Sequence, residues 1–254
     1  MKVLRASTRM VNGRYECPML WKTTISCVPD TLQMAETRFA NLERRFHRDL
    51  DYARRYAAVI DEYLQAGHAT TVSKRSRDRD TWFLPHHAVQ SPNKQGKLRV
   101  VFDASARTNG ICLNDMLLTG PNLLTDLFSL LLRFREYPVA VSADIAKMFH
   151  QVLVSEKDRS MLRFLWRTPR STEPLRHLQM TVHIFGAVCS PTICTYVLRR
   201  NAEDHRTSFP DVWRKVWDNF YVDNYLDSYA SEKEATLSCH GLKKTAIARR
   251  IPSD

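Results

Sequence analysis

The fold is decided by one stretch of the sequence, Asn219–Asp227, which reads NFYVDNYLD. Aromatic and β-branched residues stand on both sides of a central acidic–amide pair, Asp223–Asn224. Such flanks around an Asp-Asn pair are typical of a tight β-hairpin, because Asp and Asn favour turns. A carboxylate at a hairpin tip can face a cation or a phosphate, and a plain surface turn is the alternative. The stretch alone leaves both interpretations open.

The overall charge of the chain points to a polyanionic partner. Its 254 residues hold 38 Lys and Arg against 27 Asp and Glu, a net charge of +11. Nucleic acid is the first candidate for the partner and anionic lipid the rival. No apolar run approaches the roughly 18 residues of a membrane span. The first residues also lack the apolar region of a secretory signal. We therefore expect an intracellular, cytoplasmic protein that is neither secreted nor bound to a membrane.

The six cysteines are scattered along the chain. They form no C-x-x-C pair and have no histidine at zinc-binding spacing. We expect reduced thiols and no zinc site.

Two helices are expected near the N-terminus. Asp30 is a candidate N-cap for a helix whose apolar positions run to Phe46. A second helix runs from Tyr52 to Leu64 and stops at Gly67. The outer faces of both helices carry five arginines, Arg44, Arg45, Arg48, Arg54 and Arg55. A solvated face is the preferred interpretation of these charges, and phosphate contact is the alternative.

A strand hairpin is expected to follow, made of residues 82–89 and 97–103. The adjacent histidines, His86 and His87, point to opposite faces of an extended strand, so they cannot chelate one metal together. Lys97 and Arg99 share one face of the second strand. Two cations there suit a phosphate, and a solvated edge strand is the alternative.

The middle of the chain predicts a carboxylate at the end of a strand. Residues 121–135 form an amphipathic, mostly buried helix in this prediction, and a buried strand, 139–143, ends at Asp144. A carboxylate at a strand end is a common site position, although it can also cap the following turn. Residues 149–154 are predicted to continue as a strand.

Two further strands, 162–166 and 178–184, are predicted to precede a turn into a helix. Ser190 and Pro191 stand in the preferred order for the first positions of that helix. The run Ser231–Glu234 has the pattern of a capping box that opens a last helix.

These features occur in a recognisable order. The basic strand residues Lys97 and Arg99 come first, and they are followed by Asp144, the Gly186–Pro191 helix entry and Asp223. In this order the chain resembles a reverse transcriptase of the right-hand polymerase group, and in particular the Pao/BEL class of long-terminal-repeat retrotransposons. The stretches that carry the likeness are 82–89, 96–103, 113–121, 139–152, 179–191, 199–204 and 219–228. They cover most of the chain up to about residue 235.

The resemblance implies an α+β fold made of polymerase fingers and palm, with an antiparallel palm sheet backed by helices. The expected parts are an N-terminal extension and fingers (1–118), a first palm segment (119–150), a fingers continuation (151–189) and a second palm segment (190–254). Relatives continue into a thumb. None is recognisable after Ser228, so we expect the chain to lack a thumb.

The implied activity is RNA-directed DNA polymerisation on an RNA or DNA template-primer with deoxynucleoside triphosphates. In the parent element it takes place in a virus-like particle. Two Mg²⁺ ions, or Mn²⁺ in their place, stabilise the attacking and leaving oxygens of the in-line displacement. By resemblance Asp144 and Asp223 bind both ions, and Asn224 completes the catalytic hairpin. Such hard cations prefer carboxylate oxygen.

The remaining roles also come from the resemblance. Arg99 steadies the triphosphate, and Phe149 is the aromatic gate against a ribose 2′-hydroxyl. Gly186 lets the backbone approach the nucleotide or template closely, and Phe185 precedes it where the floor of the pocket would be. Core packing is the alternative role for Phe149. Lys97 and Tyr221 are expected to contact nucleic acid.

Asn224 departs from the family pattern Tyr-x-Asp-Asp. An amide removes one negative charge from a dication site, so we expect weaker Mg²⁺ binding and slower turnover. The alternative hypothesis is a catalytically dead retroelement fragment that at most binds nucleic acid.

Overall fold

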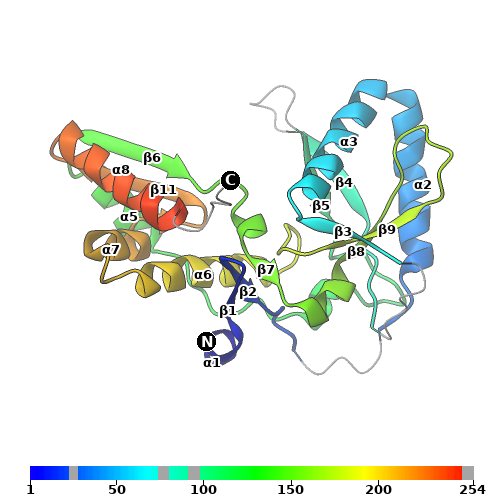
Figure 1. The fold of residues 1–254 in the computed structure, drawn as a ribbon, viewed down its shortest axis with the longest axis horizontal. Helices are drawn as coiled ribbons and strands as arrows, with labels where there is room; N and C mark the ends of the chain where they lie inside the picture. The colour runs from blue at the N-terminus through cyan, green and yellow to red at the C-terminus, as the bar shows by residue number, and fades with distance from the viewer. Residues whose placement is uncertain (23–27, 74–79, 91–97, 248–254) are drawn as a thin grey trace. The chain divides into compact units, whose positions relative to one another are not determined.

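The computed structural model describes residues 1–22, 28–73, 80–90 and 98–247 (Figure 1). Helices alternate with small antiparallel sheets, so the α+β prediction is confirmed. The chain divides into two compact units. Unit 1 comprises residues 1–16, 120–152 and 191–254, and unit 2 comprises residues 17–119 and 153–190. No helix in the described ranges has the length and apolar character that crossing a bilayer requires.

The two predicted N-terminal helices are present in unit 2. Helix α2 spans Leu32–Arg48 and helix α3 spans Leu50–Gln65. The buried positions of α2 recur three or four residues apart, at Ala35, Phe39, Leu42 and Phe46, and form one apolar face. Asp49 caps α3, because its carboxylate accepts a hydrogen bond from the Tyr52 N–H at 2.9 Å.

Two small sheets pack with these helices. Strands β3 (Ala69–Val72), β9 (Arg176–Met180) and β8 (Arg163–Trp166) form one antiparallel sheet in that order. Strands β4 (His86–Gln90) and β5 (Leu98–Phe102) form the predicted hairpin. Short elements complete unit 2: α4 (Leu113–Met116), β7 (Leu153–Val154) and the 3-10 helix η2 (Glu156–Leu162).

The core of unit 2 is built around His86. Its ring is buried among aromatic side chains from both helices and both sheets, namely Phe39, Tyr56, Phe102, Phe164 and Trp166. The Nε2 atom lies 2.8 Å from the Leu165 carbonyl, which can only accept, so Nε2 carries the proton. Nδ1 then accepts from the Tyr56 hydroxyl. His87 is exposed, which confirms that the two histidines point to opposite faces.

Unit 1 holds a three-stranded antiparallel sheet. Its order is β10 (Phe220–Tyr221), β11 (Asn224–Tyr229) and β6 (Val139–Asp144). Helices α5 (Leu127–Phe134) and α8 (Glu232–Ile247) pack against β11, and α7 (Pro210–Asp218) packs against α8 and β10. The sheet is therefore backed by helices (Figure 1). The N–H of Glu234 donates to the Ser231 hydroxyl at 3.3 Å, as the capping pattern predicts.

Unit 1 also contains helix α6 and the first elements of the chain. Helix α6 spans Ser190–Asp204, and its start at Ser190 agrees with the predicted helix entry. Helix α1 (Lys2–Ser7) precedes a hairpin of strands β1 (Arg9–Val11) and β2 (Arg14–Cys17).

Three predictions about the middle of the chain are wrong. Helix α5 is shorter than predicted and buries only Leu130, while five apolar side chains lie exposed at Leu124, Leu127, Phe128, Leu131 and Leu132. Strand β6 is exposed or half-buried along its whole length rather than a core strand. Of the predicted strand 149–154 only Leu153–Val154 is a strand, because residues 148–151 form the 3-10 helix η1 (Met148–Gln151), which starts after Lys147 with its φ of 51°.

Candidate active site

The hairpin within Asn219–Asp227 has a two-residue turn. Tyr221 pairs with Asn224, so the turn consists of Val222 and Asp223 rather than the predicted Asp223–Asn224 pair. Val222 has a φ of 56°, a left-handed conformation that β-branched residues rarely adopt. Strain of this kind persists only where the surrounding structure fixes the backbone, and it is frequent at functional sites.

The structure brings the two predicted metal ligands to the same end of the sheet. Asp144, the last residue of β6, lies directly opposite Asn224 in the β6–β11 register. The N–H of Ile145 donates to the Asp223 carbonyl at 2.9 Å, which ties the residue after Asp144 to the hairpin turn. Cβ atoms of opposed residues in an antiparallel pair lie about 5 Å apart. Residues from segments 80 positions apart therefore share one site.

The side chains at this end of the sheet carry two negative charges. Asp144 is exposed and Asp223 is half-buried, and neither forms an ion pair with any residue in the described ranges. The Asn224 side-chain amide donates to Asp223 Oδ1 at 3.2 Å. A carboxylate at position 224 would repel Asp223, whereas the Asn224 amide attracts it through this hydrogen bond.

The donor chemistry of these residues fits a magnesium ion that is completed by other ligands. Mg²⁺ is usually held by one or two carboxylates, with substrate phosphates and water filling its octahedron. Asp144 and Asp223 supply two such carboxylates. No group of three or more His, Cys, Asp or Glu side chains suited to a metal exists among the described residues. Two carboxylates would leave most positions of an octahedral ion to substrate phosphates and water.

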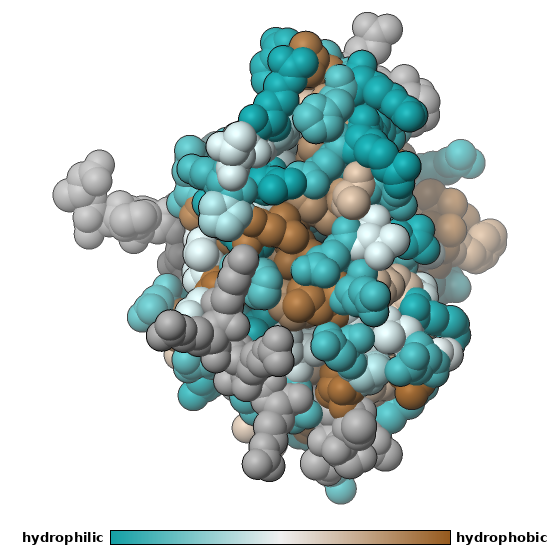
Figure 2. Space-filling view, turned by 90° about the vertical axis from the view of Figure 1, so that its right-hand side faces the viewer, coloured by the Kyte–Doolittle hydropathy of each residue, from teal (hydrophilic) through white to brown (hydrophobic). Residues whose placement is uncertain are grey.

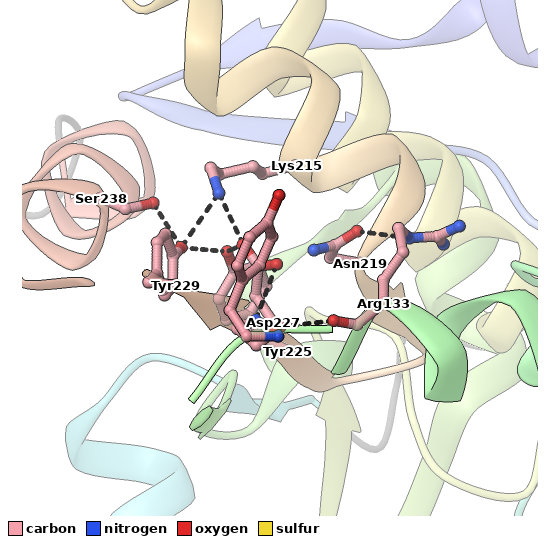
Figure 3. Close-up of polar contacts among 9 residues, drawn as sticks. Arg133, Lys215, Asn219, Tyr225, Asp227, Tyr229 and Ser238 are labelled. Carbon is pink, nitrogen blue, oxygen red and sulfur yellow. Dashed lines mark hydrogen bonds and ion pairs between the residues drawn. The ribbon is translucent and has the colours of Figure 1, made fainter. Parts of the chain in front are cut away.

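A buried polar network lies behind the hairpin, on the helix side of β11 (Figure 3). Asp227 Oδ2 accepts from Lys215 Nζ and from the Tyr225 hydroxyl, both at 2.6 Å. Lys215 also donates to the Tyr229 hydroxyl at 3.1 Å, and Tyr229 donates to the Ser238 hydroxyl at 2.6 Å. The network joins β11 to α7 and α8, so it fixes the strand that begins at Asn224.

Electrostatics keep the Lys215–Asp227 pair ionised. Burial alone raises the pKa of Asp227, but hydrogen bonds from Lys215, Tyr225 and Tyr229 outweigh it and hold the pKa below its ordinary value. Burial, followed by the hydrogen bonds to Asp227 and Tyr229, raises the pKa of the Tyr225 hydroxyl far above its usual range. Tyr225 thus remains a hydrogen-bond donor at any physiological pH.

A second set of contacts holds the start of the hairpin. Arg133 of α5 donates to the Asn219 side-chain carbonyl at 3.1 Å, and the Leu226 N–H donates to the Asn219 backbone carbonyl at 3.0 Å. Asn219 is buried. The residues before and after the turn are therefore both anchored, which is the condition for holding Val222 in its strained conformation.

Two further predicted site residues lie in unit 1. Tyr221 is half-buried and stands opposite Asn224 in the hairpin. Phe149 lies in η1, five residues after Asp144, and only 6% of its surface is exposed. This burial agrees with core packing, the alternative role for Phe149, and the gate role stays a prediction.

The other predicted nucleotide-binding residues lie in unit 2. Arg99 is exposed on β5, where the buried residues Leu98, Val100 and Phe102 alternate with it. The role of Arg99 toward a triphosphate stays a prediction. Lys97 lies outside the described residues. Phe185 is 42% exposed and precedes Gly186, whose φ is +109°.

Within unit 2 the Gly186 loop lies directly against strand β5. A Cβ atom on Gly186 would stand 2.1 Å from the Phe102 carbonyl oxygen. Asn114 of α4 fixes the same loop, because its amide donates to the Gly186 carbonyl at 2.9 Å and accepts from the Val188 N–H at 3.0 Å. Gly186 thus allows a close backbone approach to β5, and its approach to a nucleotide or template stays a prediction.

No protein-family model and no curated protein matches the sequence. Among solved structures, the chain is similar to a foamy viral protease–reverse transcriptase in complex with ds DNA, with a TM-score of 0.54 and 16% sequence identity. The match covers 75% of this chain. The chain has a reverse-transcriptase-like fold. It spans 28% of the length of that viral chain.

Replacing Gly186 by Ala is expected to destabilise the reverse-transcriptase-like fold by roughly 2–3 kcal/mol. The new Cβ meets the backbone of Phe102, which cannot rotate away, and the positive φ disfavours any L side chain. Urea unfolding of the purified chain measures the effect. The matched control is Gly110→Ala, which has a φ of +79° but no atom within 4 Å. Equal losses for the two variants would show that the contact with Phe102 is not the cause.

Sequence reasoning missed the residues that support the candidate site residues, above all Lys215, Asp227 and Asn114. One signal was present: Tyr225, Asp227 and Tyr229 alternate along a strand, so three polar side chains share one face. The sequence gives no corresponding sign of Lys215 as their partner, because α7 approaches β11 only in the folded unit. Asn114 carries no local signal either.

Proposed function

We propose that the chain is the fingers and palm part of a reverse transcriptase of a Pao/BEL-class long-terminal-repeat retrotransposon. In this proposal unit 1 contains the palm and unit 2 the fingers. The activity is RNA-directed DNA polymerisation, with a template-primer and deoxynucleoside triphosphates as substrates. One observation carries the proposal: the β6–β11 register and the Ile145 N–H set Asp144 beside the Asp223 turn at the end of a helix-backed sheet.

The chemistry assigned to this chain's residues is binding and positioning. Asp144 and Asp223 would hold divalent cations, which supply Lewis-acid stabilisation of the attacking and leaving oxygens in the displacement. The Lys215–Asp227 network and Arg133 hold the hairpin so that Asp223 stays beside Asp144. Exposed Arg99 is proposed to contact the triphosphate, Phe185 and Gly186 to line the nucleotide pocket, and Phe149 to act as the sugar gate. Tyr221 and Lys97 are proposed to contact nucleic acid.

A second candidate function is nucleic-acid binding without polymerisation. It is favoured by the amide at Asn224, which leaves two carboxylates where the family pattern has three. The same amide donates a hydrogen bond to Asp223. The basic composition, +11 overall, supports binding under either candidate.

Primer extension with the purified chain distinguishes the two candidates. Template-directed incorporation that requires Mg²⁺ or Mn²⁺ is expected, and Asp144→Asn should lower its rate by a factor of roughly 100 or more, because a ligand to a catalytic metal is worth several kcal/mol. Asp211→Asn is the matched control, an exposed carboxylate on α7 of the same unit. Absence of incorporation, or incorporation that Asp144→Asn leaves unchanged, would contradict polymerisation by this chain.

A further inference from the structure

A row of polar side chains, four of them cationic, runs along the exposed face of helix α2 in unit 2. We call this row the arginine stripe; its members are Arg38, Asn41, Arg44, Arg45 and Arg48. Residues three, four and seven positions apart lie on the same side of a helix. The opposite side of α2 is buried in the aromatic core, which fixes the direction in which the stripe faces. The stripe is therefore a preformed surface on a rigid element.

Part of the stripe is shaped and oriented. Asn41, Arg44, Arg45 and Arg48 line a shallow surface hollow of about 320 Å³. The Arg45 guanidinium lies 3.8 Å from the centroid of the Tyr52 ring, an arrangement that holds it by a cation–π contact. Arg44 donates to the Asn41 side-chain carbonyl. Ordered guanidinium groups lose less conformational freedom when they bind an anion.

The charge of the stripe is not neutralised within the described part of the chain. None of its four arginines forms an ion pair there, whereas the neighbouring Arg54 and Arg55 on α3 both pair with Asp51. Glu43, an acidic residue of α2 next to Arg44 in sequence, lies on another side of the helix and pairs with Arg167 at 2.6 Å. Each pair of like charges four positions apart, such as Arg44 and Arg48, destabilises a helix by roughly as much as a pair of opposite charges would stabilise it. A polyanion relieves this repulsion.

The spacing and surroundings of the stripe favour a nucleic acid over a lipid surface. From position 38 to position 48 a helix rises about 15 Å, enough to follow several phosphates of a strand. A helix that binds a membrane needs large apolar side chains beside its charges. No large apolar residue of α2 is exposed, and polar residues cover most of the side that carries α2, around a smaller apolar area (Figure 2).

We propose that the arginine stripe of α2 is a binding site for the phosphate backbone of a nucleic acid. The guanidinium fork suits phosphate oxygens, and the contacts read charge rather than sequence. The inference replaces the solvated-face interpretation for Arg44, Arg45 and Arg48, and it keeps that interpretation for Arg54 and Arg55. It goes beyond the proposed polymerisation and does not depend on it, because the site holds no group of the catalytic hairpin.

The test is a salt titration of binding to fluorescein-labelled duplex DNA, read by anisotropy in EDTA and without nucleotides. The triple variant Arg44→Gln, Arg45→Gln, Arg48→Gln removes about three phosphate contacts. Its slope of log affinity against log salt is therefore expected to be smaller in magnitude by about 2 to 3. EDTA removes any contribution from cations at Asp144 and Asp223, so the result is independent of catalysis.

A matched triple variant removes the same charge at ion-paired positions, Arg54→Gln, Arg55→Gln and Arg206→Gln. Its slope should change by less than half as much. Equal changes in the two triple variants, or an unchanged slope in the stripe variant whose circular dichroism is native, would overturn the proposal. If the stripe variant lost binding to phosphatidylserine vesicles but bound DNA as the parent chain does, the proposal would be overturned in favour of a lipid surface.

Discussion

Asn224→Asp is expected to raise Mg²⁺-dependent nucleotide incorporation by this chain roughly a hundredfold. A unit charge about 4 Å from another contributes about 4 kcal/mol at an effective dielectric constant near 20. Repulsion from Asp144 and Asp223 offsets part of this gain. A remainder of about 3 kcal/mol corresponds to a factor of about 100 in rate at limiting metal concentration. The change also removes the amide that now donates to Asp223, which frees that oxygen for a metal.

Primer extension at several Mg²⁺ concentrations measures this gain. The matched control is Asn122→Asp, an exposed position of unit 1 whose side-chain oxygen already accepts from the Leu124 N–H, so an aspartate fits there. The double variant Asp144→Asn, Asn224→Asp should lose the gain. Equal rates for Asn224→Asp and the parent chain at every Mg²⁺ concentration would show that position 224 does not limit the site.

The same substitution has a second expected effect that requires no catalysis. Three neighbouring carboxylates repel each other, so Asn224→Asp should lower the melting temperature in EDTA. Added Mg²⁺ should restore it, because a ligand that binds the folded state stabilises that state. The parent chain, with two carboxylates and the Asn224 amide, should respond less to Mg²⁺.

Lowering the pH from 6.5 to 4 is expected to destabilise unit 2 by roughly 6 kcal/mol. Burial lowers the pKa of His86 to about 4, and burial also lowers the pKa of His183 to about 4. A histidine whose folded pKa lies below the ordinary 6.5 favours the neutral form. The unfolded chain therefore takes up protons first as the pH falls. The stability is fully present above pH 6.5 and is lost progressively down to pH 4.

The size of this loss follows from the two pKa values. A fall from 6.5 to about 4 corresponds to about 3 kcal/mol for each histidine. Their sum is comparable to the whole stability of a typical domain. Acid unfolding of unit 2 should therefore begin above the range in which most carboxylates titrate.

Urea unfolding followed by tryptophan fluorescence at several pH values measures the loss, since Trp82 and Trp166 are buried in unit 2. The double variant Tyr56→Phe, His86→Leu should lose about half of the pH dependence, because His183 still titrates. His87→Gln, a change at the exposed neighbouring position, should keep all of it. A stability that does not vary between pH 4 and 6.5 would contradict buried neutral histidines.

The sequence predicted best those elements whose pattern is local. Strand alternation separated His86 from His87, because successive side chains of a strand always point to opposite faces. Helical spacing found α2 and α3 with their apolar faces. The Asp-Asn pair indicated the hairpin but placed its turn one residue too late, since the turn is Val222–Asp223. Each of these features depends on neighbours within a few residues.

The burial of α5 and β6 was mispredicted because it depends on the rest of the fold. Both segments are apolar, and an apolar run predicts burial only if another element covers it. In unit 1, α5 presents Leu130 to the sheet, while Phe128 and Leu132 on its other side remain exposed.

The carboxylate pair was predictable from a resemblance in order along the chain. Its support by Lys215 was not, because no short-range pattern links positions 215 and 227.

The division of the chain into interleaved segments has a consequence for its synthesis. Val72 of β3 pairs with His177 of β9, and Asp144 of β6 pairs with Asn224 of β11. A ribosome that adds about 5–20 residues per second makes the second member of the first pair roughly 5–20 s after the first. Helices α2 and α3 then wait with their aromatic faces uncovered, and the first segments of both units exist before either sheet can close. The nascent chain is therefore expected to need chaperone protection until most of it has emerged.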